Sequence, residues 1–319
     1  MTRKLASITS LVLAATTALA IASLNQGPCN AALSSLEPPK ATDEEKTVER
    51  HLQILERKWN EHDLDGVMRH YADDYVNNDG LDKKSVLELT KDLWKNYPDA
   101  KSTSKMGKIR IEGKFATVDS HDTATGFTAK ELPAIGGKGE LSSVSEGQLF
   151  LKKVGDDWKI IGDRIDYERV RVAFGMARNL KASFTAPEQV KAGQEFSAKL
   201  LVQVPPELLA VGSITSEPLQ YPQITHTEVW RQIDDESQTI ERVIRANNSN
   251  HNELLMATIG ITGTNENERM KLKGLTYITR RLNVVPSNTP VVKPSSKASE
   301  ADSKKAPVLT PDTHDETLE

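Results

Sequence analysis

Residues 143–172 read SVSEGQLFLKKVGDDWKIIGDRIDYERVRV, two runs rich in β-branched and aromatic residues around Gly155-Asp156-Asp157. Gly and Asp tolerate the backbone conformations of a tight turn. Two extended runs on either side of such a turn predict an antiparallel hairpin of long strands. The period-two pattern begins earlier, from Lys101 through residues 116–127, where Thr, Val and Ser recur. We therefore expect several antiparallel strands that end in this hairpin.

Before Lys101 the apolar residues recur with the period of a helix. Thr42 and Glu45 have the spacing of a capping box, which predicts a helix from there to about Glu61. Asp63 is placed to cap a short second helix, and a third is expected from about Asp82. Helices followed by antiparallel strands predict an α+β fold. The expected buried residues of the three helices are Val48, Leu52, Leu55 and Trp59, then Leu64, Val67, Met68 and Tyr71, then Val86, Leu89, Leu93, Trp94 and Tyr97.

Three short motifs in this order resemble the nuclear-transport-factor-2-like, or SnoaL-like, family. They are WNEHDLDG at 59–66, YADDY at 71–75 and GDDWKII at 155–161. The resemblance covers residues 42–172 and implies a cone-shaped curved sheet that wraps on the three N-terminal helices. It also implies a pocket, but no single activity, because this fold serves isomerases, cyclases, dehydratases, transport factors and binding modules.

The resemblance to ketosteroid isomerase within that family places Asp79 at the position of the general base. The positions of its two oxyanion donors fall near Leu55 and near Gln148 or Leu149. None of these side chains can replace the Tyr and protonated Asp that hold the oxyanion. The chemistry of ketosteroid isomerase is therefore not expected.

Two residues are candidate catalytic bases, Asp79 and His121. Strand alternation puts Asp119 on the face of His121, where it could orient the imidazole if the face is inward, but an exposed polar face is the favoured interpretation. Residues 78–80, Asn-Asp-Gly, also have the composition of a simple turn. The candidate ligand-binding residues are Trp59, Tyr75, Asn77, Trp94, Asp119 and Arg164. The tryptophans could instead be core residues, and Arg164 could form a surface ion pair with Asp163 or Asp166.

Residues 178–286 contain short extended runs separated by turns, which predict a separate immunoglobulin-like β-sandwich. The predicted strands are 181–184, 195–204, 224–233, 238–246, 253–261 and 272–285, with a turn at 192–194. The Cys…Trp…Cys signature of antibody domains is missing, and Trp230 and Tyr277 are expected in the core. His226 and Glu228 lack a third donor, so we expect no metal site.

The two ends of the chain are not expected to be part of the folded protein. Residues 1–32 have the layout of a signal peptide and leader, followed by a linker at 33–41. Residues 287–319 are rich in Pro, Ser and charged residues and predict a disordered tail. We expect an exported protein, periplasmic or extracellular, without stable membrane insertion after cleavage. No lipobox precedes Cys29, so a lipid anchor is not expected.

The composition argues against several classes of function. The 319 residues include 41 Lys and Arg and 45 Asp and Glu, a net charge of −4, so a nucleic-acid partner is not expected. No nucleotide-binding loop or catalytic metal motif is present, so no cofactor is expected. We predict a binding protein for a small apolar or amphipathic ligand or for an envelope protein. The alternatives are a SnoaL-like isomerase, dehydratase or cyclase, and a structural module that forms a homodimer through its first domain.

Overall fold

The computed structural model describes residues 42–221, 227–233, 236–264 and 271–287. Three helices come first: α1 (Asp43–Asn60), α2 (Leu64–Met68) and α3 (Lys83–Asn96). The Thr42 hydroxyl accepts from the Glu45 backbone N–H while the Glu45 carboxylate accepts from that of Thr42, so the predicted capping box is present. The side chains of Asp63 and Asp82 cap α2 and α3 by accepting from the backbone N–H of Gly66 and of Ser85. No helix within these ranges is long and apolar enough to cross a membrane.

Twelve strands make up most of the rest of the described chain. They are β1 (Lys101–Glu112), β2 (Phe115–Leu132), β3 (Gly137–Val154), β4 (Asp157–Gly175), β5 (Lys181–Thr185), β6 (Gln189–Lys191), β7 (Glu195–Gln203), β8 (Leu208–Pro218), β9 (Arg231–Gln232), β10 (Thr239–Arg245), β11 (Glu253–Gly263) and β12 (Leu272–Val285). A short 3-10 helix, η4 (Met176–Asn179), follows β4. The large sheet has the order β1-β2-β3-β4-β12-β11-β8-β9, with β6 beside β12. The second sheet has the order β10-β7-β5.

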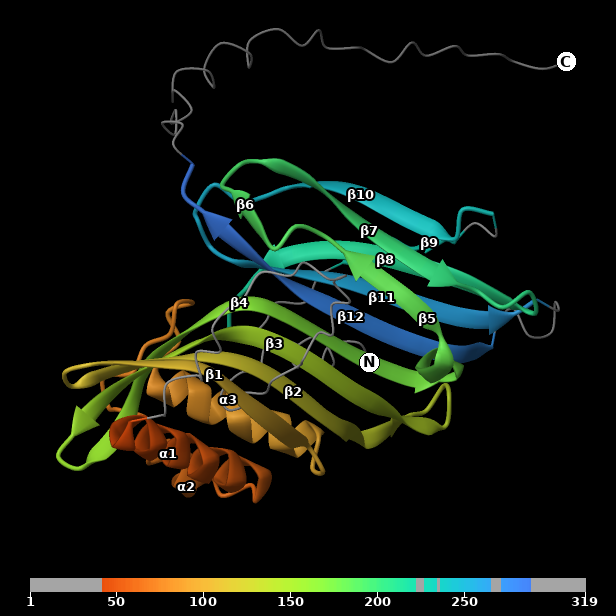
Figure 1. Cartoon of the computed structure of the whole chain (residues 1–319). Helices are drawn as coiled ribbons and strands as arrows, with labels where there is room; N and C mark the ends of the chain where they lie inside the picture. Colours follow the sequence, from red (N-terminus) through yellow and green to blue (C-terminus); the bar gives the residue numbers. More distant parts are fainter. Residues whose placement is uncertain (1–41, 222–226, 234–235, 265–270, 288–319) are drawn as a thin grey trace, which may run out of the picture. The chain divides into compact units, whose positions relative to one another are not determined.

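The predicted α+β fold, with a cone-shaped sheet wrapped on three helices and a separate sandwich, is wrong. The described chain is mostly β, and its helices have only 18, 5 and 14 residues. The strands of the first half also continue into those of the second half, because β12 pairs with β4 from Gly274 with Gly175 to Arg280 with Arg169 (Figure 1). The pairing with β12 covers an edge of β4 that would otherwise present a long row of unpaired backbone groups.

Two hydrophobic cores lie on opposite faces of this large sheet. Helices α1 to α3 pack on one face of β1 to β4, which we call the helix-covered face, around Leu52, Trp59 and Trp158 (Figure 1). The β10-β7-β5 sheet packs on the other face of β8, β11 and β12, around Leu200 and Ile259. The strand predicted at 224–233 is present only as β9 within the described residues, and β8 was not predicted.

Irregularities in the β3–β4 hairpin determine which residues of β4 face the helices. The hairpin turns at Gly155, whose φ is 63°. Its register shifts between Glu146 and Gly147 and again between Phe150 and Leu151. At the first shift the carbonyl oxygen of Arg164 lies 2.1 Å from where a Cβ of Gly147 would be, so only glycine fits there. These bulges place Asp163 and Glu168 on the same face of β4, although they are five residues apart.

Candidate ligand-binding site on the helix-covered face

A row of polar side chains crosses three strands on the helix-covered face. Asp122 on β2 is paired with Ser145 on β3, and Ser145 is paired with Glu168 on β4. In the next row Ser143 on β3 is paired with Val170 on β4. All four polar side chains are buried. Interior sheet faces are normally apolar, so a buried row of this kind needs a specific reason.

One carboxyl oxygen of Glu168, Oε1, and the hydroxyl of Ser143 have no hydrogen-bond partner within the described residues. Burial raises the pKa of Glu168 to about 7, although Arg281 lowers it. Native proteins satisfy most of their buried polar atoms, so these two are candidates to bond a ligand.

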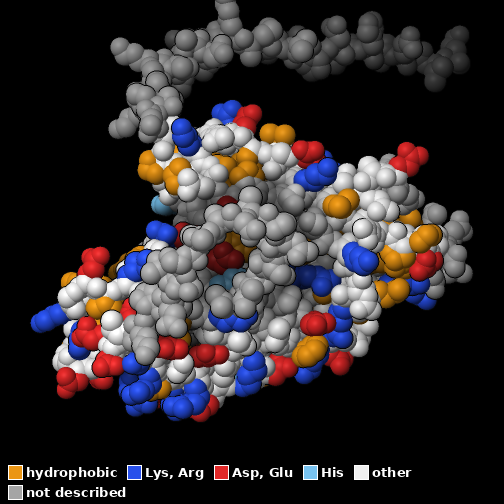
Figure 2. Space-filling view, viewed as in Figure 1, with side chains coloured by type: hydrophobic (Ala, Val, Ile, Leu, Met, Phe, Trp, Pro, Cys, Tyr) orange, Lys and Arg blue, Asp and Glu red, His pale blue; other side chains and the backbone are white. Residues whose placement is uncertain are grey.

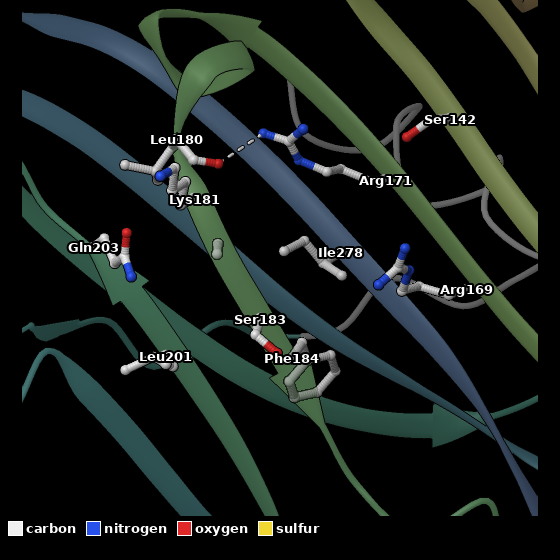
Figure 3. A pocket seen from close by; sticks show the side chains of 11 residues that line it. Ser142, Arg169, Arg171, Leu180, Lys181, Ser183, Phe184, Leu201, Gln203 and Ile278 are labelled. Atoms are coloured by element: carbon white, nitrogen blue, oxygen red, sulfur yellow. Dashed lines mark hydrogen bonds between the residues drawn. The ribbon is translucent and has the colours of Figure 1, made fainter. Parts of the chain in front are cut away.

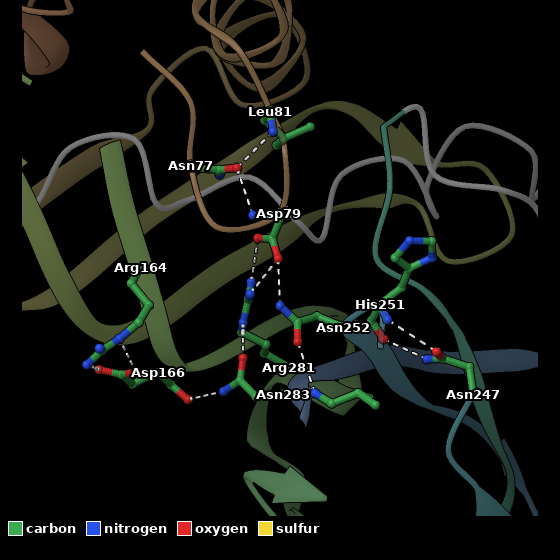
Figure 4. A network of polar contacts seen from close by, with 11 residues as sticks. Asn77, Asp79, Leu81, Arg164, Asp166, Asn247, His251, Asn252, Arg281 and Asn283 are labelled. Atoms are coloured by element: carbon green, nitrogen blue, oxygen red, sulfur yellow. Dashed lines mark hydrogen bonds and ion pairs between the residues drawn. The ribbon is translucent and has the colours of Figure 1, made fainter. Parts of the chain in front are cut away.

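A charged network lies beside Glu168. Arg281 on β12 donates two hydrogen bonds to the Asp79 carboxylate, at 2.8 and 2.6 Å (Figure 4). The Asn252 amide also donates to Asp79, at 2.8 Å, and Arg281 Nε donates to Asn283 Oδ1 at 2.7 Å. The exposed fraction is 0% for the Arg281 side chain and 7% for that of Asp79. A buried ion pair persists only with such additional hydrogen bonds.

Asp163 is the third acid of this region. Its carboxylate accepts a hydrogen bond from the hydroxyl of Tyr75, and both residues are buried. Burial raises the pKa of Asp163 to about 6, with a further upward contribution from Asp79 and opposing effects of Tyr75 and Arg281. We call Asp79, Asp163, Glu168 and Arg281 the Arg281 cluster. It holds three carboxyl groups and one guanidinium, so a proton on Asp163 or Glu168 relieves its excess of negative charge.

Three of the residues singled out from the sequence lie at this cluster or next to it: Tyr75, Asn77 and Asp79. The Asn77 side chain accepts from the backbone N–H of Asp79 and of Leu81, at 3.0 and 2.9 Å, and so holds the turn. Asp79 is therefore both a turn residue and a buried one. Its carboxylate is occupied by Arg281 and Asn252, which leaves it poorly placed to take a proton from a substrate.

Asp119, His121 and Arg164 are not brought to this cluster. Asp119 binds Arg110 and Gln148, while His121 Nδ1 lies 2.9 Å from Glu146, so the two do not contact each other as an acid-base pair would require. Their alternation with buried Asp122 puts them on the opposite face of β2. Arg164 forms an exposed ion pair with Asp166 at 2.8 Å, as the surface alternative predicted.

The aromatic candidates belong to the helix core. Trp59 is buried, and its ring lies edge-on to that of Trp94 with centroids 5.8 Å apart. His62 stacks on Trp94 with centroids 4.7 Å apart.

Trp230 was predicted in the core of the second half, but it is 44% exposed. Burial raises the pKa of Tyr277 to about 12.

No cluster of three or more His, Cys, Asp or Glu residues that could hold a metal ion occurs in the described part of the chain. His226 and Cys29 lie outside the described residues. Glu228, which was not expected to bind a metal, accepts a hydrogen bond from Thr258. Acidic and basic side chains are mixed over the visible described surface (Figure 2).

Sequence reasoning missed Asp122, Ser143, Glu168 and Arg281. The signal for Glu168 was present, because Glu168, Val170 and Val172 alternate on one face of a strand whose apolar members predict burial. No comparable signal exists for Arg281. Its position depends on the pairing of β12 with β4, which joins residues about a hundred positions apart in the sequence.

Comparisons with known proteins give partial similarity only. No protein-family model and no curated protein matches the chain. Among solved structures, Bd1075 of Bdellovibrio bacteriovorus is 17% identical, with a TM-score of 0.31 over 38% of this chain and 39% of its own. A putative scytalone dehydratase from Novosphingobium aromaticivorans is 17% identical, with a TM-score of 0.30 over 38% of this chain and 82% of its own. A hexachlorocyclohexane dehydrochlorinase, LinA-type3, from Novosphingobium barchaimii is 11% identical, with a TM-score of 0.29 over 39% of this chain and 88% of its own.

Proposed function

We propose that the protein is an exported binding protein that holds a small amphipathic ligand on the helix-covered face of its large sheet. The observation that carries this proposal is the buried Glu168 carboxyl group, whose Oε1 has no partner within the described residues. Leaving such a group unsatisfied costs roughly 1–3 kcal/mol or more. A ligand that bonds to Glu168 would remove this cost whenever it is bound.

The surroundings of Glu168 favour a ligand with one polar end and an apolar body. Ser143 offers a hydroxyl, and Glu168 exchanges its proton near neutral pH, so together they suit a hydroxyl or carbonyl group. Leu141, Val170 and Val172 are buried in the same core and suit the apolar body. A few polar groups on an apolar wall are typical of small-molecule sites.

Native mass spectrometry of the protein, purified gently from its own cells, tests this proposal. We expect a stoichiometric small molecule on the wild type and its loss from Ser143→Leu, because the added side chain would occupy the helix-covered face. Thr125→Leu is the matched control, since Thr125 is an exposed residue of β2. An unliganded wild type, or equal occupancy in all three proteins, would contradict the proposal. The same spectra test the expected homodimer.

A second candidate function is proton-transfer catalysis at the same site. The specific observation is that burial raises the pKa of two carboxyl groups of the Arg281 cluster, Asp163 to about 6 and Glu168 to about 7. Groups that titrate near the working pH are the most effective acids and bases. The wild type should convert the co-purified ligand chemically. The Glu168→Gln variant should still bind the ligand but no longer convert it, and these two results together would establish the activity.

Export rests on the leader sequence alone, because residues 1–41 lie outside the described residues. Mass spectrometry of the mature protein tests it through the position of the new N-terminus. Removal of the N-terminal segment, with the new N-terminus no later than residue 33, and recovery outside the cytoplasm are the expected results.

A further inference from the structure

A groove lies on the opposite face of the large sheet from the Arg281 cluster. Its volume is about 430 Å³, within the range of about 300–1,000 Å³ that is usual for small-molecule sites. One wall comes from β3, β4 and β12, and the other from β5 and β7. The lining residues are Ser142, Arg169, Arg171, Leu180, Lys181, Ala182, Ser183, Phe184, Leu201, Gln203 and Ile278. We call it the arginine groove.

The charged lining residues of the arginine groove are all basic: Arg169, Arg171 and Lys181. Within the described residues, no hydrogen bond or ion pair is formed by the Arg169 or Lys181 side chain. Figure 3 shows the two arginines on the β4 side, with Lys181 across the groove from Arg171. The nearest acid to act on Arg171 is Glu140, which also lies 3.9 Å from Arg178.

A further arginine increases the like-charge repulsion at this end of the sheet. Arg280 on β12 is the direct cross-strand partner of Arg169 on β4. Like charges placed directly opposite each other destabilise a sheet. Arg280 donates to the carbonyl of Phe184 at 3.3 Å, while its Nε is buried without a partner in the described chain. An anion bound near Arg169 would relieve this repulsion.

Arg171 is held in place for such a role. Its Nη2 donates to the carbonyls of Ala177 and Arg178, at 2.6 and 3.1 Å, and to that of Leu180 at 3.3 Å. Its Nε and Nη1 have no partner within the described residues. A guanidinium fixed through one nitrogen, with the N–H groups of its other two nitrogens remaining, is suited to receive an oxyanion with little loss of conformational entropy.

The other lining residues are three polar ones, Ser142, Ser183 and Gln203, and the apolar Leu180, Ala182, Phe184, Leu201 and Ile278. Leu180, Phe184 and Ile278 are buried in the core beneath it, and Leu201 is 40% exposed at its rim. Apolar area next to paired arginines fits a molecule that carries both kinds of group. We propose that the arginine groove binds a small amphipathic oxyanion, with the carboxylate or phosphate between Arg169 and Arg171 and the hydrocarbon part towards Leu201 at the rim.

Isothermal titration calorimetry with octyl phosphate and octanoate, below their micelle concentrations, tests this inference. We expect one-to-one binding of at least one probe, and at least tenfold weaker binding of 1-octanol and of inorganic phosphate. Arg169→Gln should weaken binding at least tenfold, since it removes a charge-assisted contact. Arg245→Gln is the matched control, because Arg245 is an exposed residue of β10 that pairs with Glu195.

A second pair of variants tests the apolar part of the site. Leu201→Ser should weaken binding of the octyl probes severalfold, whereas Val243→Ser, at a 67% exposed residue of β10, should leave it unchanged. Arg169→Gln should also leave the thermal stability of the unliganded protein unchanged or raised, because it relieves repulsion. The inference would be overturned if neither probe binds, if 1-octanol binds as tightly as the two probes, or if Arg169→Gln binds them with the affinity of the wild type. None of these results depends on the site at Glu168.

Discussion

The guanidinium of Arg281, on β12, forms a two-point ion pair with the carboxylate of Asp79, 202 residues earlier in the chain. Asp79 lies in the turn before α3, so the contact joins the helical first half to β12, the last strand in the sequence. Both side chains are buried, and neither can be solvated if its partner is removed.

Removal of one member of this pair should be strongly destabilising. Asp79→Asn keeps the shape of the side chain but leaves Arg281 buried without its main countercharge, which costs about 3–5 kcal/mol. We expect a loss of this order in the free energy of unfolding, measured by urea denaturation. Arg164→Gln breaks an exposed ion pair and should change stability by less than about 1 kcal/mol. Equal effects of the two substitutions would show that the buried pair is unimportant.

The pH dependence of stability should report the buried Glu168. Its pKa is raised to about 7 in the folded protein from an ordinary 4.5, so the folded state holds the proton more tightly than the unfolded state. Its contribution to stability is therefore greatest below about pH 4.5 and is lost as the pH rises to about 7. Glu168→Gln cannot ionise, so its stability relative to wild type should rise by on the order of 2–3 kcal/mol between pH 4.5 and pH 8.

Urea midpoints at a series of pH values measure this difference. Glu131→Gln controls for the loss of one carboxylate at an exposed position of β2. If the difference in stability between Glu168→Gln and the wild type does not vary with pH, Glu168 is solvated in the folded protein.

A histidine pair should make the protein sensitive to acid. His70 Nδ1 lies 3.1 Å from His51 Nε2. Burial lowers the pKa of His51 to about 3 and that of His70 to about 4. Below the unfolded value of 6.5 the unfolded chain takes up protons that the folded protein does not, so stability is lost as the pH falls from 6.5 towards 4.

Replacement of one histidine should reduce this loss. We expect His70→Asn to lose about 1 kcal/mol less stability than wild type between pH 7 and pH 5, after allowance for partial solvent screening. His121→Asn is the control, because His121 lies at the surface beside Glu146. Histidine resonances that titrate near pH 6.5 at both positions would contradict the prediction.

The pairing of β4 with β12 predicts how the protein responds to truncation. A fragment of residues 42–179 keeps the helices and β1 to β4 but exposes the edge of β4 that β12 covers. An exposed long edge favours association. We expect light scattering to show oligomers for this fragment and a monomer or defined dimer for residues 42–287. A well-folded, monomeric fragment with unchanged thermal stability would instead support the domain boundaries predicted at residues 172 and 178.

Local features of the fold could be predicted, but long-range pairing could not. The capping box at Thr42 and Glu45 and the turn at Gly155 depend on residues close in sequence, and both are present. The joining of β4 to β12 has no local signal, so two separate domains were expected where one large sheet runs through both halves. β8 was missed because Gly212 and Pro218 interrupt its pattern.

The candidate site was predicted only in part for a related reason. Alternation showed that Asp119 and His121 share a face of β2, but it could not show that Asp122 faces the helices instead. On β4 the bulge beside Gly147 changes the alternation, so a period of two would have put Asp163 and Glu168 on opposite faces. Asp79 was singled out as a base, while its partner Arg281 could not be foreseen.

The most direct test of the proposed binding site is a crystal structure of the protein purified from its own cells without removal of bound molecules. We predict electron density for a small organic molecule on the helix-covered face, with a polar atom within hydrogen-bond distance of Glu168 Oε1 and of the Ser143 hydroxyl. A lone water molecule at Glu168, or close side-chain packing with no additional density, would contradict the account.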